Sequence, residues 1–444
     1  MSPHRALPRR RTALVAACLA LTALAGCGDD DQSGGSPFGG TPKAAEAAGP
    51  TDLGFPVVAT RNTTRTASDD PVAAAAAMAR AIYSGGAAET QARAIALVDK
   101  RDWRAALAAS SLMAKPIGAP ILFSDGTQLP EITQDALRTL RPAGSEPAGG
   151  AQVFRVGAVG RPSGLRTNDI DGRDPAELAL AIDRLTAAAR RRASDSVLVV
   201  SAERPEFAVP AAAWAAKSGD PIAFVTKNGL PAATKRQLAD HPRATIFVLG
   251  PSSVIPPAVT KQLRQYGTVR RTGGSDPISN AIGFAKYGSG AFGWHITGAG
   301  HGFTFARADA PLLGITLAPL AATGLHGPLL LLDSADKLPE PVRNFLLDFQ
   351  PGIPSTGDAS DGYYNRGWLA GSASAISPQV QSQIDALLEI SPVNERAPAE
   401  TGDAPQPGDA QADGGGSNTT TTGATTTTGP TPPGRTTKKP DDGR

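Results

Sequence analysis

A cluster of glycines between Thr297 and Gly302 has the spacing of a phosphate-binding turn. The segment is Thr-Gly-Ala-Gly-His-Gly, and glycines at alternate positions after a strand let backbone N–H groups approach a phosphate. A dinucleotide site also needs a helix directly after the turn and an acidic residue about 20 residues further on. The sequence predicts neither of these, and the corresponding positions of the repeats described below are not glycine-rich. We therefore interpret the segment as an irregular turn.

Other catalytic and metal-binding patterns are weak. His295 and His301 could ligate a metal, but the chain has only five histidines and no acidic cluster near these two. The sequence contains no Gly-x-Ser-x-Gly elbow, no Walker A loop and no His-Glu-x-x-His motif. The neighbouring carboxylates Asp69 and Asp70 suit a helix N-terminus, where the helix dipole stabilises negative charge. We expect neither an enzyme nor a bound cofactor.

The amino-acid composition excludes few kinds of binding partner. The 444 residues include 43 basic and 41 acidic side chains, and the resulting net charge of +2 does not indicate nucleic-acid binding. The two cysteines, Cys18 and Cys27, both lie near the N-terminus, so the folded region has no disulfide framework or thiolate metal site. Its core must be held by packing alone.

A strand-turn-helix pattern occurs three times, at intervals of roughly 100 residues, which suits a small domain. In each copy a Pro precedes a short apolar run that predicts a buried strand, and Leu-Pro after a polar turn predicts an amphipathic helix. The polar turns differ in chemistry while the rest persists, so we interpret the pattern as scaffold. The copies are GAPILFSDGTQLPEITQDAL from Gly118, GDPIAFVTKNGLPAATKRQL from Gly219 and GPLLLLDSADKLPEPVRNFL from Gly327.

A second motif opens each repeat. An Arg-Thr pair is followed by an Asp-Pro pair, and Asp before Pro predicts a helix N-cap with Pro at the first helical position. We therefore expect a helix to begin at each Asp-Pro pair. The openings are Arg65-Thr66 with Asp70-Pro71, Arg166-Thr167 with Asp174-Pro175, and Arg271-Thr272 with Asp276-Pro277.

Strands and helices alternate from Thr51 to Ile390, which predicts parallel sheets covered by helices on both faces. Two departures interrupt this regularity. The first repeat has Arg161 to Asp171 where the others have a closing helix, and the third carries an insertion, Gln350 to Asn365, that suits either a ligand loop or a contact between repeats. The expected first strands are Ala94 to Val98, Val197 to Ser201 and Phe292 to Thr297, and the expected third strands are Val153 to Gly157, Thr245 to Gly250 and Gly367 to Gly371.

These motifs together resemble the cell-wall-binding repeat (type 2) family of Gram-positive surface proteins. The resemblance covers most of Thr51 to Ile390 and is best in GAPILFSDGTQLP, GDPIAFVTKNGLP and Thr245 to Ser253. It implies an α/β fold of three Rossmann-like (flavodoxin-like) parallel-sheet subdomains in a pseudo-threefold arrangement. It also implies non-covalent binding to anionic polymers of the wall. The openings depart from the family, because Asp70-Pro71 and Asp276-Pro277 stand where typical members have Asp-Arg-Tyr.

Binding of such a polymer would need basic residues near strand ends or helix N-termini, where backbone N–H groups also attract anions. The alternative is that each opening Arg pairs with an acidic residue of its own motif, for instance Asp70 or Asp276. The ligand-binding candidates suggested by the resemblance are Arg65, Arg166, Arg271 and Lys227.

The N-terminus resembles a bacterial lipoprotein signal. Pro8 to Arg11 is basic, Thr12 to Ala25 is apolar but too short for a spanning helix, and Leu24-Ala25-Gly26-Cys27 matches a lipobox. The resemblance implies that Cys27 is diacylated and becomes the mature N-terminus, and an ordinary cleaved signal is the alternative. Several acyl chains would hold the protein at the membrane, at roughly 0.8 kcal/mol per buried methylene. Arg10-Arg11 also allows twin-arginine export.

Both ends of the folded region have the composition of unstructured chain. Gly, Ala, Pro and Ser before residue 50 predict a flexible tether, and Gly, Pro, Asp and Thr after residue 396 predict a disordered tail. The tail suits an O-glycosylated stalk or a simple solvated end, and we favour the second. We expect a signal peptide at 1–26, a tether at 27–50, repeats at 51–160, 161–266 and 267–395, and a tail at 396–444.

Two classes of function fit these features. The first is an extracytoplasmic, lipid-anchored envelope protein whose repeats bind wall polymer or serve as a structural module between membrane and wall. The second is a solute-binding lipoprotein with a ligand in a cleft between lobes. Three similar units, rather than two lobes, favour the first class.

Overall fold

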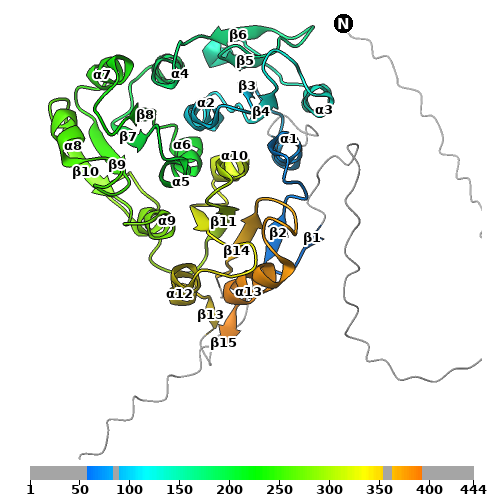
Figure 1. The fold of residues 1–444 in the computed structure, drawn as a ribbon. Coiled ribbons are helices and arrows are strands. Elements are labelled where there is room, and N and C mark those ends of the chain that lie inside the picture. Colours follow the sequence, from blue (N-terminus) through cyan, green and yellow to red (C-terminus); the bar gives the residue numbers. More distant parts are fainter. Residues whose placement is uncertain (1–57, 84–89, 354–362, 393–444) are drawn as a thin grey trace, which may run out of the picture. The chain divides into compact units, whose positions relative to one another are not determined.

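A computed structural model of the protein describes residues 58–83, 90–353 and 363–392 (Figure 1). These residues fall within one unit that spans Leu53–Arg444. They form three α/β subdomains with the same strand order, as the sequence predicted. Cys27, the tether and the tail lie outside the described residues.

The first subdomain has a parallel four-stranded sheet in the order β4-β3-β5-β6. Helix α1 (Pro71–Ile82) contacts both β4 and α3, while α2 contacts β3. The apolar run that predicted β4 is fully buried, because helices cover this strand on its two faces. The elements are β3 (Ile95–Asp99), α2 (Trp103–Ala109), η1 (Ser110–Met113), β4 (Ile121–Ser124), α3 (Glu131–Leu140), η2 (Glu146–Ala148), β5 (Val153–Val156) and β6 (Thr167–Ile170).

The second subdomain repeats this topology with the order β8-β7-β9-β10. It also has a closing helix, α8, between its third and fourth strands. The first subdomain has no helix between β5 and β6, as the sequence predicted. The elements are α4 (Pro175–Arg190), β7 (Ser196–Ser201), α5 (Pro205–Ala208), α6 (Ala211–Ser218), β8 (Ile222–Val225), α7 (Ala232–Ala239), β9 (Thr245–Leu249), α8 (Pro257–Leu263) and β10 (Thr268–Thr272).

The third subdomain has the order β12-β11-β14-β2-β1, and only the edge strand β1 is antiparallel. Its closing helix is α13. A further short pair, β13 (Gly352–Ile353) and β15 (Ser391–Pro392), forms a separate parallel ladder. The other elements are β1 (Val58–Ala59), β2 (Thr63–Arg65), α9 (Pro277–Lys286), β11 (Gly302–Arg307), α10 (Pro311–Thr316), α11 (Ala318–Ala322), β12 (Leu329–Leu332), α12 (Glu340–Asp348), β14 (Arg366–Leu369) and α13 (Pro378–Leu388).

Each opening motif supplies the fourth strand of the preceding sheet. Strand β6 follows Arg166 and completes the first sheet, and β10 includes Arg271 and completes the second. The third sheet is completed from the other end of the chain, because β2 pairs in parallel with β14 and places Arg65 opposite Leu369. In Figure 1 the blue strand β2 lies beside the orange-brown strand β14. The first repeat and the last are therefore held in one sheet.

The three Asp-Pro pairs begin helices, as predicted. Asp174 Oδ1 accepts hydrogen bonds from two backbone N–H groups of α4 at 2.9 Å. Asp276 caps α9 in the same way at 3.0 and 2.9 Å, and Asp70 accepts one bond from Val72 of α1 at 3.1 Å. Such caps contribute about 1 kcal/mol each. The carboxylates of the openings thus have a structural role.

The subdomains meet through their small inner helices, as the pseudo-threefold arrangement requires. Helix α6 contacts η1 and α11, and α10 contacts α1 and α2. Alanines on these helices belong to one hydrophobic cluster that includes buried residues of all three subdomains. Within this cluster Trp214 packs edge-on against Phe292 and Trp294, and its Nε1 donates to Asp220 at 2.8 Å. Small side chains permit the close helix contacts that join the repeats.

The expected first strand of the third repeat, Phe292 to Thr297, is wrong. This segment is irregular, and β11 begins at Gly302. Phe292 and Trp294 are buried against Trp214 instead of alternating across a sheet. His295 has a positive φ of 52°, which is incompatible with a regular strand. Burial of aromatic side chains therefore explains the apolar pattern that suggested a strand.

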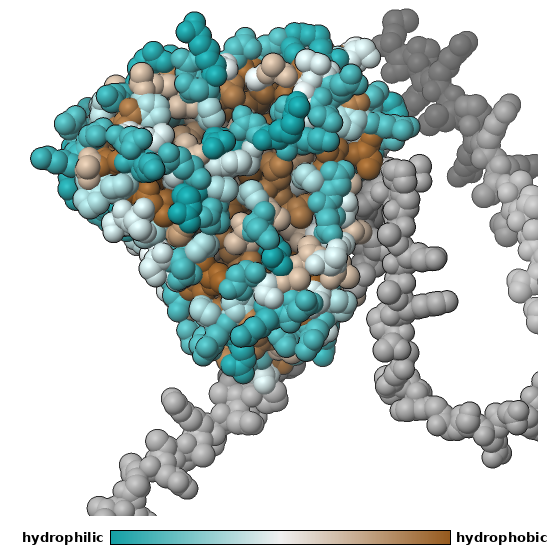
Figure 2. Space-filling model, in the orientation of Figure 1, coloured by the Kyte–Doolittle hydropathy of each residue, from teal (hydrophilic) through white to brown (hydrophobic). Residues whose placement is uncertain are grey.

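The surface in Figure 2 is mostly hydrophilic, with hydrophobic residues visible between the polar ones. No helix in the described part of the chain is long and apolar enough to span a membrane. The repeat-3 insertion is described only at its two ends, residues 350–353 and 363–365.

Candidate functional site

The predicted ligand residue Arg65 is buried at the end of β2. Its side chain is 3% exposed, and Nε donates to Oε1 of Gln381 on α13 at 2.7 Å. Burial lowers the pKa of the guanidinium, and the nearby carboxylate of Asp69 offsets part of that shift. These surroundings support a structural role in which Arg65 joins β2 to the closing helix α13.

Arg271 has an equivalent place in the second subdomain. It pairs with Val248, two residues before Gly250, just as Arg65 pairs with Leu369, two residues before Gly371. Its guanidinium donates to the carbonyls of Gly250 and Ile255, the latter at 2.8 Å. Both carbonyls lie between β9 and α8. Arg271 therefore anchors the connection to the closing helix.

Arg166 is not equivalent to these two, because it precedes β6. The register places Asp169 at the equivalent position, opposite Arg155, which lies two residues before Gly157. Arg155 instead anchors the following connection, since it donates to the carbonyls of Val159 and Gly160 at 2.6 and 3.1 Å. In the first subdomain the anchoring arginine, Arg155, therefore lies on β5 instead of on the fourth strand. An acid, Asp169, holds the fourth-strand position that is an arginine in the other two subdomains.

The alternative was that each opening Arg pairs with an acidic residue of its own motif. Among the described residues Asp69 acts on Arg65 through its charge, whereas Asp70, Asp174 and Asp276 of the Asp-Pro pairs accept hydrogen bonds from helix N–H groups. Those aspartates cap helices. Arg166 is exposed, and its Nε donates to the carbonyl of Gly150 at 2.9 Å. Lys227 is also exposed, and its backbone N–H donates to Glu203 at 2.9 Å. Of the four candidates, Arg166 and Lys227 are the ones that the fold does not tie into a connection between strand and helix.

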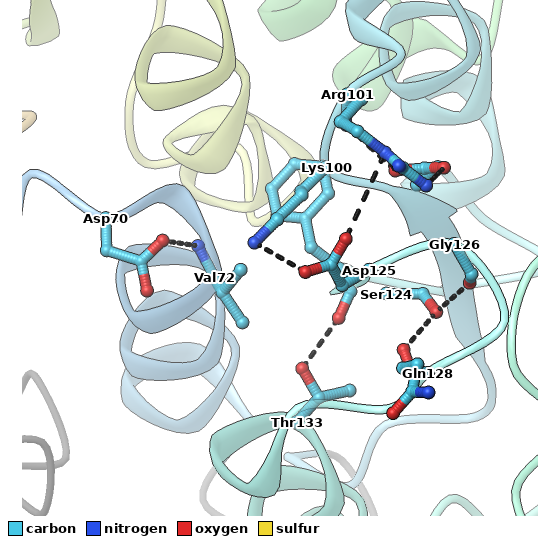
Figure 3. Close-up of polar contacts among 11 residues, drawn as sticks. Asp70, Val72, Lys100, Arg101, Ser124, Asp125, Gly126, Gln128 and Thr133 are labelled. Carbon is cyan, nitrogen blue, oxygen red and sulfur yellow. Dashed lines mark hydrogen bonds and ion pairs between the residues drawn. The ribbon is translucent and has the colours of Figure 1, made fainter.

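Figure 3 shows the carboxyl edge of the first sheet, where ligands bind in many open α/β sheets. Lys100 and Arg101 follow β3 and contact the carboxylate of Asp125 in the β4–α3 turn, at 2.9 and 4.0 Å. Arg101 also holds Asp99 through two hydrogen bonds of 3.0 and 2.8 Å. Two basic and two acidic groups therefore neutralise one another at this edge.

The turn at this edge satisfies its own polar groups. The hydroxyl of Ser124 donates to the carbonyls of Gly126 and Gln128 at 2.6 and 2.8 Å (Figure 3). Thr133 on α3 donates to the carbonyl of Phe123 at 2.7 Å, and Thr234 makes the same bond to Phe224 in the second subdomain. These internal bonds support the interpretation of the recurring stretch as scaffold.

The first subdomain is hollowed where the other two have their closing helix. In the third subdomain α13 packs on α12, and in the second Gln262 of α8 lies beside Gly229 of the β8–α7 turn. The equivalent turn and helix of the first subdomain, β4–α3 and α3, line an open hollow of about 580 Å³. A second hollow of about 650 Å³ lies along β6 and beside the end of η2. Both have the size of small-ligand sites.

The charged lining residues of these hollows are three arginines and Asp169, and Arg138 is also paired with Asp135. Arg138 and Arg161 line the first, while Arg161 and Arg166 line the second, where Asp169 is the acidic lining residue. The side chains of Arg138 and Arg161 are 65% and 56% exposed, so solvent reaches their charged groups. We call the two hollows together the arginine site. Sequence reasoning selected Arg166 but missed Arg138, Arg161 and Asp169, although the missing closing helix marked this place.

A buried histidine in the second subdomain has a different role. His241 Nε2 lies 2.7 Å from Asp183 Oδ2 on α4, and Nδ1 lies 3.0 Å from the carbonyl of Ser194. Burial opposes the charged ring, but the hydrogen bond and charge of Asp183 outweigh it and raise the pKa of His241. Because both nitrogens are engaged, this pair ties α4 to the segment after α7.

No group of three or more His, Cys, Asp or Glu side chains among the described residues could hold a metal ion. The glycine-rich segment from Thr297 is irregular, as predicted, and it leads into β11 instead of following a strand. His301 lies in this segment, and burial together with the charge of Lys217 lowers the pKa of its ring.

Comparison with known proteins supports the fold. No family model matches the chain. Over 146 residues, 33% of the chain, it is 30% identical to the amidase enhancer of Bacillus subtilis (strain 168), but these residues span only 19% of that protein. Two solved structures from Clostridium difficile, Cwp6 and Cwp8, superpose with TM-scores of 0.60 and 0.56 at 16% and 18% identity.

Each of these two alignments covers 74% of the chain, and they cover 48% and 52% of the Cwp6 and Cwp8 chains. The protein thus spans about half the length of its structural neighbours and a fifth of its curated relative. The likeness shows a shared fold. Membership of the cell-wall-binding repeat family stays a prediction.

Proposed function

We propose that the protein is a non-enzymatic, extracytoplasmic envelope protein that binds an anionic cell-wall polymer at the arginine site. Diacylated Cys27 would hold the chain at the membrane, so that the three subdomains lie between membrane and wall. The fold shared with the cell wall proteins Cwp6 and Cwp8 supports a place in the envelope. The partial match to the amidase enhancer agrees with a wall-associated role.

The observation that carries this proposal is the arginine site itself. Arg138, Arg161 and Arg166 line it, and one acidic side chain, Asp169, lines it with them. The planar guanidinium donates paired hydrogen bonds to carboxylate and phosphate groups, which are the charged groups of anionic polymers. Within the described part of the chain the closing helix is missing from the first subdomain alone, so the proposal predicts one polymer site per chain.

The experiment is co-sedimentation of the purified Cys27→Ser chain with isolated cell walls. This variant lacks the acylation site, so binding to walls is measured without acyl chains. We expect saturable binding that weakens as salt rises, because partly exposed arginines are screened by ions. Absence of co-sedimentation, together with saturable binding of a small molecule in calorimetry, would favour the solute-binding lipoprotein instead.

The membrane anchor has its own test. A labelled palmitate precursor should enter the wild-type chain, and the chain should fractionate with membranes. Cys27→Ser should lose the label, whereas Cys18→Ser, which changes the other cysteine of the signal region, should keep it. Label in the Cys27→Ser chain would contradict acylation at this residue.

A further inference from the structure

Asp169 lines the second hollow of the arginine site and is paired with two arginines. Its Oδ2 accepts hydrogen bonds from Arg161 at 2.5 Å and from Arg155 at 2.7 Å. We propose that Asp169 is a built-in competitor, which holds Arg161 until a carboxylate or phosphate of the polymer replaces it. This inference rests on the proposed function. It adds that Asp169 sets the affinity of the arginine site for the polymer.

The two arginines that share Asp169 are held very differently. The side chain of Arg155 is only 15% exposed and is fixed by the carbonyls of Val159 and Gly160 as well. Arg161 is 56% exposed, and its other contact is the hydroxyl of Thr167. An arriving anion can therefore take Arg161, while Arg155 stays with Asp169 and keeps the carboxylate in place.

Arg161 is also placed to serve a chain-like ligand. It lines both hollows, whereas Arg138 lines only the first and Arg166 only the second. A polymer lying across both hollows would meet Arg138, Arg161 and Arg166 with successive acidic groups. Leu129 and Leu165, both half-buried, line the first hollow and offer apolar surface to the faces of sugar rings. The ligand class is therefore a polysaccharide that carries repeated carboxylate or phosphate groups.

The other subdomains indicate that the fold does not require this acid. The equivalent positions hold Arg65 and Arg271, and both of these anchor the closing helix or its connection. In the first subdomain Arg155 has taken over that anchoring from the neighbouring strand. Of the three equivalent positions, the one that carries an acid is therefore the one in the first subdomain, where the closing helix is missing and the site is open.

The test compares Asp169→Asn with the wild type, both on the Cys27→Ser chain, using cell walls and two defined probes, polygalacturonate and polyphosphate. The amide keeps an acceptor for Arg155 but competes weakly for Arg161. We expect the dissociation constant of Asp169→Asn to fall by roughly two- to fivefold, as release of a partly exposed ion pair allows. The probe with the larger change identifies carboxylate or phosphate as the preferred group.

The matched control is Asp195→Asn, which removes the same charge from an exposed ion pair with Arg192 in the second subdomain. It should leave binding unchanged. The gain should also vanish when Arg161→Gln is combined with Asp169→Asn. Melting curves of each variant show whether the fold is kept. Equal gains from Asp195→Asn and Asp169→Asn, or no gain with any probe from a folded Asp169→Asn, would overturn the inference.

The outcomes separate the two proposals. If the wild type binds walls and Asp169→Asn binds them no better, the competitor role is wrong and the polymer-binding proposal stands. If walls are not bound but the probes bind Asp169→Asn more tightly, the competitor role stands and the wall is the wrong source of the polymer.

Discussion

The first and third subdomains use one strand order but differ in the segment that comes after the third strand. In the third, α13 packs on β14 and α12, and the buried Arg65 joins it to the sheet. In the first, a short loop tied down by Arg155 takes its place, and arginines surround the surface left open. Omission of one helix thus converts a covered, structural position into a candidate binding site.

The second subdomain adds a contrast in the connecting helices. Nine residues after the capping Asp, α4 carries Asp183, whereas α1 and α9 carry the buried alanines Ala79 and Ala285. Asp183 is paired with His241 inside the protein. The repeats therefore share their caps and strands but differ in how each connecting helix is held.

The largest effect should come from breaking that buried pair. His241→Leu leaves Asp183 buried without its partner, and we expect a loss of about 3–5 kcal/mol in the free energy of unfolding. Denaturant titration measures it. The double variant His241→Leu with Asp183→Leu should recover much of the loss, because the unpaired charge is removed. A loss below about 1 kcal/mol in the single variant would contradict the role of the pair.

The same pair predicts a pH dependence. The pKa of His241 is raised in the folded protein, so its contribution to stability is full below the unfolded value of about 6.5. That contribution is lost as pH rises through the folded pKa. Unfolding titrations across this window should show stability falling toward alkaline pH in the wild type. His241→Gln should flatten that part of the curve, and an unchanged slope would refute the assignment.

Side chains on the closing helix of the third subdomain should contribute more to the free energy of unfolding than side chains beside the open site of the first subdomain. Ile384 on α13 is fully buried, so Ile384→Ala should cost about 2–5 kcal/mol. Leu165, which lines the open hollow and is only half-buried, is the matched aliphatic position. Leu165→Ala should cost clearly less than Ile384→Ala. Similar losses at both sites would mean that the first subdomain is packed as fully as the third.

The shared caps should give smaller and graded effects. Asp174 and Asp276 each accept two backbone hydrogen bonds, and Asp70 accepts one. We expect Asp174→Ala and Asp276→Ala to cost about 1–2 kcal/mol, and Asp70→Ala to cost less. Thermal unfolding of the three variants ranks them, and a larger loss from Asp70→Ala than from the other two would contradict the ranking.

Much of the scaffold could be predicted from sequence because its signals are local. Asp-Pro marks a helix start wherever it occurs, and a short apolar run after Pro marks a buried strand. The missing closing helix after Gly157 was visible as a lack of apolar periodicity. Phe292 and Trp294 led to the wrong prediction of a strand at 292–297. Aromatic residues that pack on Trp214 give the same apolar pattern in the sequence as a buried strand.

The rest depends on contacts between distant residues. No local pattern tells that the strand containing Arg65 pairs with β14, some 300 residues later in the chain. The equivalence of Arg65, Asp169 and Arg271 likewise depends on strand register, while counting from Arg-Thr to Asp-Pro had selected Arg166. The arginine site was missed for the same reason, since Arg138 and Arg161 come together only after the sheet and α3 have packed.

The most direct test of the central claim is the wall-binding isotherm of Arg161→Gln with Arg166→Gln, measured in the Cys27→Ser chain. The control removes the same charge from the exposed residues Arg192 and Arg264 of the second subdomain. If the open position of the first subdomain binds the polymer, the site variant should bind at least about tenfold more weakly than the control. Equal affinity of the two variants would contradict the account.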